Sequence, residues 1–279
     1  MNVFQRFVRF VIAAIACLVP AASFAADSVA FITDLRGQVA LDGAPRPALL
    51  AEVAKGQRIS VGKDSQVALM YSASGREFVL KGPGEFVVKD SEVAAESGAA
   101  PVARPTAWRP ADEVRVHVAQ SSSASVRMRS IAPPKTDAPA SFPAQGAIAT
   151  LQPTFRWRGD ANSRGEFMLV GSGDEKPVHV AKTVGESYRL PVKLVPAKDY
   201  AWTVAVAGSE VAAGRFRTLS AAELDRIERS RPAPGAEFSD RVMFALALQA
   251  AGAAQEAREA WAALARERAD LPELAAFAR

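Results

Sequence analysis

The chain has 279 residues, of which 49% are apolar and 23% charged, and its 34 basic and 30 acidic residues give a formal net charge of +4. That weak balance argues against a dedicated polyanion-binding protein, which would carry a clear excess of basic residues. A single cysteine, Cys17, argues against a disulfide framework and against a zinc site built from several thiolates.

Residues 1–25 have the order of a cleavable secretory signal peptide. Two basic residues precede a ten-residue apolar run from Phe10 to Val19, which ends at Pro20. Small residues then lead to Ala25, as a signal peptidase requires. A membrane anchor needs about 20 apolar residues, so this run is too short to span a bilayer. We expect cleavage after Ala25 and a mature chain that is periplasmic or secreted.

Cleavage would change the charge and the thiol content of the chain. It would remove Arg6, Arg9 and Cys17, leaving 32 basic and 30 acidic residues and no cysteine. Stability would then depend on apolar burial without any disulfide. A lipoprotein would instead be acylated on Cys17, but Ala14 stands where such signals usually carry leucine. Lipidation of Cys17 stays open as the less favoured alternative.

Residues 28–93 alternate between apolar and polar side chains in short runs. The runs are Val39–Leu41, Ile59–Val61, Val67–Tyr71, Phe78–Leu80 and Phe86–Val88. Gly or Asp stands in nearly every gap between them, which is typical of tight turns. Several short strands separated by turns predict a small antiparallel β-domain.

The same region resembles the periplasmic FecR domain. The resemblance rests on Val29 to Val39 with its Gly37-Gln38 turn, Gly56 to Ile59, Val67 to Gly75, and Leu80 to Phe86 with its Gly82-Pro83-Gly84 turn. It implies a β-domain outside the membrane that senses or transmits an envelope signal. FecR regulators also carry a cytoplasmic anti-sigma segment followed by a membrane span, and neither is visible in this sequence. The resemblance therefore does not imply a sigma-factor role.

Residues 94–146 are rich in Ala, Pro and Ser and are predicted to be mostly linker. Two segments, 114–118 and 126–129, alternate at the period of a strand and could return to the first β-module. Their outward-facing residues would be Arg115, His117, Arg127 and Arg129. Paired antiparallel, the two strands would form a basic stripe for an anionic glycan, a lipid phosphate or an acidic protein surface. The alternative is an ordinary solvated sheet face.

The four tryptophans divide into two groups. Trp108 lies between Pro105 and Pro110 with no periodic reason for burial, which makes it the best single candidate for an exposed ligand or partner contact. The others are Trp157, Trp202 and Trp261. They lie at apolar periodic positions and are predicted to pack in cores.

Residues 147–219 predict a second β-module. Phe167–Val170 and Tyr200–Val206 are strand-like, and Gly171–Asp174 is a predicted hairpin turn. Leu194-Val195-Pro196 before Tyr200 resembles the tyrosine corner of sandwich domains, in which the phenol bonds to upstream backbone. With Trp157 upstream, the segment resembles a fibronectin type III domain, which implies a β-sandwich.

Residues 220–279 have helical periodicity. Ser220 and Glu223 predict a capping box, and Ser239 is expected to begin a second helix that ends at Gly252. A third helix follows. Overall, the sequence predicts a mainly β protein with two small β-modules and a C-terminal α-helical hairpin.

The helical hairpin resembles a single tetratricopeptide repeat. The resemblance rests on Gly252, Ala257 and Trp261, with Leu264 continuing the apolar face. One repeat cannot bury its own apolar face, so the hairpin must dock on something. The cover is either the second β-module with the helix that begins at Ser220, or a second protein. The short connection after Thr218 favours docking on the second β-module, with a partner surface left on the polar side.

The sequence contains no recognisable constellation for catalysis or metal binding. His117 and His179 lie in different predicted modules without carboxylates at ligand spacing, whereas a zinc site needs three or four ligands. Ser60 and Lys63 match a Ser-x-x-Lys spacing, but on a predicted strand and turn and without that motif's partners. We predict that the protein is not an enzyme and binds no cofactor and no metal.

The sequence favours a periplasmic FecR-domain protein that acts by protein binding in envelope sensing, signalling or scaffolding. The alternative is a peptidoglycan or anionic-glycan binder that uses the basic stripe and Trp108. An envelope protein is the expected partner. Neither nucleic acid binding nor a transmembrane span in the mature chain is expected.

Overall fold

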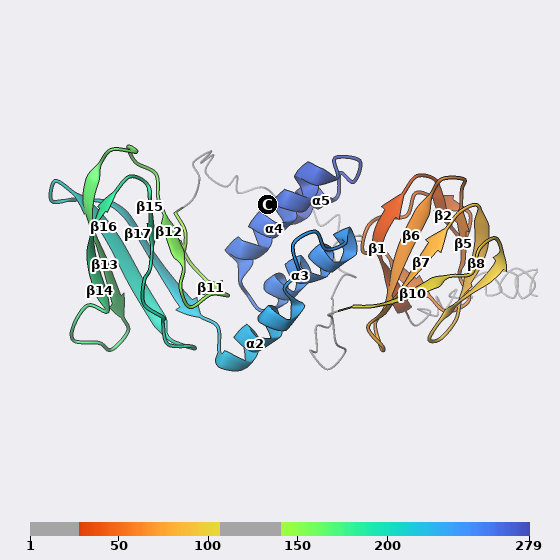
Figure 1. The fold of residues 1–279 in the computed structure, drawn as a ribbon, viewed down its shortest axis with the longest axis horizontal. Coiled ribbons are helices and arrows are strands. Elements are labelled where there is room, and N and C mark those ends of the chain that lie inside the picture. The colour runs from red at the N-terminus through yellow and green to blue at the C-terminus, as the bar shows by residue number, and fades with distance from the viewer. Residues whose placement is uncertain (1–27, 107–140) are drawn as a thin grey trace, which may run out of the picture.

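Two β-modules lie at the ends of an elongated molecule, and the helical tail lies between them (Figure 1). The computed structural model describes residues 28–106 and 141–279. The fold is mainly β with a C-terminal helical hairpin, as the sequence predicted. Within these described ranges, no helix is both long and apolar enough to cross a bilayer.

The first β-module consists of two five-stranded antiparallel sheets that share one core. One sheet has the order β10-β7-β6-β1-β4 and the other β3-β2-β5-β8-β9. The strands are β1 (Ser28–Arg36), β2 (Val39–Leu41), β3 (Ala44–Pro45), β4 (Glu52–Ala54), β5 (Arg58–Val61), β6 (Gln66–Tyr71), β7 (Arg76–Lys81), β8 (Gly84–Val88), β9 (Val93–Ser97) and β10 (Val102–Pro105). Ile32, Leu69 and Phe86 are buried in this core.

Strand β1 is buried along six consecutive residues, from Ala30 to Leu35. Side chains alternate between the two faces of a strand, so both faces of β1 must be covered. The second sheet of the module covers one face, and helix α3 (Phe238–Ala250) of the tail also contacts β1. The tail therefore acts as a third layer over this part of the first module.

The first module extends further than the sequence predicted. Strand β10 pairs antiparallel with β7 from Val102↔Val79 to Pro105↔Arg76, so residues 94–105 belong to the module rather than to a linker. The Ala- and Pro-rich composition was misleading because an edge strand needs hydrogen bonds on one side only and tolerates proline.

The second β-module has a five-stranded sheet, β11-β17-β16-β13-β14, and a two-stranded sheet, β12-β15. Its strands are β11 (Ala147–Ile148), β12 (Thr154–Arg156), β13 (Arg164–Gly171), β14 (His179–Val184), β15 (Ser187–Arg189), β16 (Asp199–Val206) and β17 (Ser209–Thr218). Trp157 and Trp202 are buried in a core of their own with Phe155, as predicted. The amide of Val195 donates a 2.9 Å hydrogen bond to the Tyr200 hydroxyl, which confirms the predicted corner bond.

The tail consists of α2 (Ala221–Ser230), α3, α4 (Ala254–Glu267) and the short α5 (Leu274–Phe277). The capping box of Ser220 and Glu223 is present, and Gly252 ends α3 with a φ of +79°. The prediction that Ser239 begins α3 is wrong, because the helix starts at Phe238 and Ser239 is buried. Its hydroxyl bonds to Glu77 of the first module instead of capping its own helix.

The tail is docked within the chain, but mainly on the first module. Val242, Trp261 and Leu264 are buried in the same apolar cluster as the core of the first module. The expectation of docking on the second module is therefore wrong for the apolar face. The short connection after Thr218 fixes only the start of α2, and the chain turns before α3 begins.

Candidate functional site

The candidate site is the pair of interfaces that the tail makes with the two β-modules. The first turn of α4 bonds to the second module, whereas the residues that follow α4 bond to the first module. One short part of the chain thus joins both modules.

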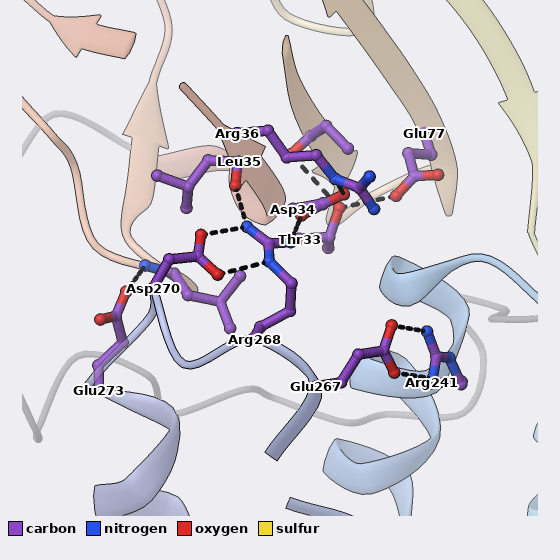
Figure 2. A network of polar contacts seen from close by, with 12 residues as sticks. Thr33, Asp34, Leu35, Arg36, Glu77, Arg241, Glu267, Arg268, Asp270 and Glu273 are labelled. Carbon is purple, nitrogen blue, oxygen red and sulfur yellow. Dashed lines mark hydrogen bonds and ion pairs between the residues drawn. The ribbon is translucent and has the colours of Figure 1, made fainter. Parts of the chain in front are cut away.

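Arg268 is the central residue of the first interface. Figure 2 shows its side chain pointing from the tail toward Asp34 of β1 and Asp270. Its Nη1 donates to Asp34 Oδ1 at 2.6 Å, and its Nη2 donates to the Leu35 carbonyl and to Asp270 Oδ2. Hydrogen bonds to Asp270 and Asp34 raise the pKa of the guanidinium above its ordinary value. The bond from Arg268 likewise lowers the pKa of Asp270, so the charged pair is favoured.

The turn after Arg268 adds two bonds to the loop between β3 and β4. The Arg46 guanidinium donates to the carbonyl oxygen of Asp270 at 2.5 Å, and the Leu49 amide donates to Glu273 Oε1 at 3.0 Å. The tail is therefore held at both β1 and the β3–β4 loop.

Glu77 of β7 lies in a second polar cluster of the first interface and is fully buried. Its Oε1 accepts a 2.7 Å bond from Thr33, and its Oε2 accepts bonds from Arg104 and Ser239. Arg104 also donates to Asp240 of α3 at 3.0 Å. Burial alone would lower the pKa of Arg104, but its bonds to Glu77 and Asp240 raise it overall. The edge strand β10 thus supplies the cation that compensates a buried carboxylate.

The second interface is built from side chains of the first turns of α4. Gln255 accepts a 3.1 Å bond from the Ala144 amide and donates a 2.9 Å bond to the Ser141 carbonyl. Glu259 forms an ion pair with Arg156 of β12. These bonds hold the segment that leads into β11 against the start of α4.

Glu256 accepts a 2.8 Å hydrogen bond from the Ala149 amide in the same interface. Burial is the main cause that raises the pKa of its carboxyl, and the nearby Glu259 adds to it, whereas the bond from the Ala149 amide and the charges of Arg231 and Arg156 oppose it. The net result is a pKa of about 7. The second interface therefore contains a carboxyl that titrates near neutral pH.

Two open cavities flank the interfaces. One of about 690 Å³ lies on the second module, with Arg215 and Arg217 beside Ala147, Val170 and Ala201. The other, of about 680 Å³, lies between the first module and the turn at Leu271. The first combines two cationic side chains and the carboxylate of Asp199 with an apolar floor.

The residues that the sequence singled out as contacts lie outside the part of the chain that the structure describes. Trp108, Arg115, His117, Arg127 and Arg129 all fall in 107–140, outside the described residues, so the exposed contact and the basic stripe stay predictions. The sequence did contain one signal for the first interface. Asp34 is a lone acid within the apolar run of β1, and a charged residue in a buried strand needs a partner.

The described residues contain no group of three or more His, Cys, Asp or Glu arranged to hold a metal ion. His179 lies on β14, where its Nε2 is 2.6 Å from the Tyr188 hydroxyl and its ring stacks on the Tyr188 ring. It is a partly exposed strand residue.

No protein-family model matches the chain, and no curated protein matches it significantly.

Proposed function

We propose that the protein is a non-enzymatic envelope scaffold that holds two β-modules in a fixed relation and binds another envelope protein. The observation that carries the proposal is that α4 and the turn after it bond to both modules. The resemblance of residues 28–93 to the FecR domain supports a role in envelope sensing or signalling, and residues 1–25 support export.

The polar bonds of the two interfaces support a fixed relation between the modules. Domains joined only by a linker move independently unless a substantial interface holds them. Here Gln255 makes two hydrogen bonds to the segment that leads into β11, and Arg268 bonds to both a carboxylate and a carbonyl of β1. Directional bonds at both ends of one helix restrict rotation as well as separation.

The distance between the modules tests the scaffold directly. Nitroxide labels on Ala73→Cys and Lys176→Cys would report that distance by pulsed electron paramagnetic resonance. The two residues lie in exposed turns of different modules. In protein that starts at Ala26 we expect one narrow distance distribution. Combined Gln255→Ala and Glu259→Ala substitutions should broaden it, because they remove bonds to the second module.

Arg258→Ala is the matched control for this experiment, since Arg258 is an exposed residue of the same helix. The control should keep the narrow distribution. A broad distribution in the protein without interface substitutions would contradict a scaffold.

A second candidate function is binding of peptidoglycan or another anionic glycan. The cavity beside Arg215 and Arg217 favours it, because these two guanidinium groups outnumber the one carboxylate of the lining, Asp199, and lie next to an apolar floor, which suits a carboxylate-bearing sugar. Co-sedimentation with purified peptidoglycan should then fall on combined Arg215→Ser and Arg217→Ser substitution. Arg189→Ser, at an exposed position in β15, is the control. Equal sedimentation of all three proteins would rule out this candidate.

A further inference from the structure

Strand β14 forms an open edge of the second module. It is the last strand of the five-stranded sheet, at the opposite edge from β11, and no described strand pairs with its outer side (Figure 1). The other outer strands of the five-stranded sheets are β3, β4, β9, β10 and β11, each of five residues or fewer. Strand β14 has six residues and contains no proline. Among these edges it is therefore the one least protected against pairing with a strand of another chain.

Exposed apolar side chains gather at the same edge. Of the eight large apolar residues exposed in the described ranges, four lie on or beside β14: Met168, Val178, Val180 and Val184, exposed by 39%, 37%, 48% and 64%. Met168 is the register partner of Val180, and Val180 and Val184 share a face because they are four residues apart on one strand. Gathered apolar exposure of this kind is typical of an interaction site.

Lys182 adds a charge to this edge. It lies between Val180 and Val184 on the same face and is exposed. Glu166 is its register partner on β13, but no ion pair joins Lys182 to a residue of the described ranges. The open side of Lys182 can therefore accept a carboxylate from a neighbouring strand.

We propose that β14 binds an extended segment of a second protein as an added strand. Backbone hydrogen bonds along the open edge would provide affinity, and alternate side chains would provide specificity. The bound segment carries two apolar side chains that pack against Val180 and Val184, with an acidic side chain between them opposite Lys182. This inference rests on the proposed protein-binding function and names its partner surface.

The charge on the edge disfavours a second copy of the same strand. If two β14 strands paired antiparallel with Val180 opposite Val184, Lys182 of each copy would face the other. Like charges directly opposite each other destabilise a strand pair. A partner with an acidic residue at this position fits better.

Peptide binding tests the proposal. The probes are two heptapeptides with blocked ends and the sequence Thr-Val-Thr-X-Thr-Val-Thr. X is Glu in one peptide and Lys in the other. Titrated into isotope-labelled protein that starts at Ala26, the Glu peptide should shift backbone amide signals of β14 and bind roughly fivefold more tightly than the Lys peptide. Lys182→Glu should reverse this preference.

Two variants at exposed valines complete the test. Val180→Lys should abolish the shifts, whereas Val192→Lys, at a similarly exposed valine elsewhere in the second module, should leave them unchanged. Equal binding of both peptides, or none up to millimolar concentration, would overturn the proposal. If the protein dimerises and Val180→Lys abolishes the dimer, the occupant of the edge is a second copy of the chain, and the proposal is overturned. If cross-linking to an envelope protein survives Val180→Lys, the edge proposal fails while the proposed protein-binding function stands.

Discussion

The two interfaces of the helical tail differ in kind. Toward the first module, Val242 and Trp261 belong to the same apolar cluster as Phe31 and Leu69. Toward the second module, Ala149 and Leu219 also join this cluster, but the other contacts are the hydrogen bonds of Gln255 and Glu256 and the ion pair of Glu259, and the rest of that module keeps a separate core. Apolar burial provides most of the stability of a folded unit, whereas a single hydrogen bond adds about 1 kcal/mol net and an exposed ion pair such as that of Glu259 adds little. The tail and the first module should therefore unfold together, and the second module should unfold separately.

The buried charges of the first interface serve a different purpose from its apolar core. Replacing a buried ion pair by apolar residues is often neutral, but removing one partner is costly. Asp34 and Glu77 therefore contribute mainly by requiring Arg268 and Arg104 at defined places, which fixes how the tail lies on the sheet.

Trp261→Ala should have the largest effect and should separate the two units most clearly. The side chain is fully buried in the shared core, so we expect a loss of about 4 kcal/mol in the unfolding free energy of the first module and tail. Calorimetry should show that transition moving down while the transition of the second module stays in place. A single transition that moves as a whole would show that the modules unfold together.

Asp34→Ala should destabilise the same unit by roughly 3 kcal/mol, because it leaves Arg268 without one of its two carboxylate partners in a buried site. Arg36→Ala is the control, since Arg36 contacts Asp34 from an exposed position and should cost about 0.5 kcal/mol or less. Urea unfolding measures both. Equal losses for the two variants would mean that burial of the Arg268 pair has no special role.

The second interface should respond to pH through Glu256. Its pKa is about 7 in the folded protein against an ordinary value of 4.5, so folding favours the protonated carboxyl. This contribution is fully present below pH 4.5 and is lost as pH rises through 7, a loss of roughly 2 kcal/mol for a partly solvated group. The melting temperature of the protein should therefore fall as the pH is raised from 5 to 8. Glu256→Gln should flatten this dependence, and an equally steep fall in that variant would assign it to another group.

Tyr200→Phe should have the smallest effect and should act on the second module alone. It removes the hydroxyl that accepts the Val195 amide bond, which should cost about 1 kcal/mol. The calorimetric transition of the second module should shift while that of the first module and tail does not. An unchanged second transition would show that the corner bond contributes nothing.

Local sequence patterns predicted the features that depend on neighbouring residues. Alternation predicted strands in both modules, the Ser220–Glu223 spacing predicted a capping box, and Tyr200 was placed in its corner bond from a short segment. In each of these, the pattern and the contact lie within a few residues of each other, so the sequence alone carries the information.

The interfaces could not be predicted because their partners are distant in sequence. Ser239 bonds to Glu77 across 162 positions, and Arg268 bonds to Asp34 across 234. A cap-like serine at the start of a helix favours a local bond, and only the fold shows that a buried carboxylate competes for its hydroxyl. Strand β10 was missed for a similar reason, since its pairing with β7 outweighs its linker-like composition.

The burial of β1 on both faces has a consequence for how the protein matures. Because the chain is synthesised from its N-terminus, β1 is presented about 200 residues before the helices that cover it. Until those helices arrive, the first module is an incomplete sheet with an apolar surface open to chaperones and proteases. Any nonsense or frameshift mutation upstream of Phe238 would leave it permanently in that state. Whether β1 is covered on both faces thus depends on helices that lie about 200 residues further along the chain.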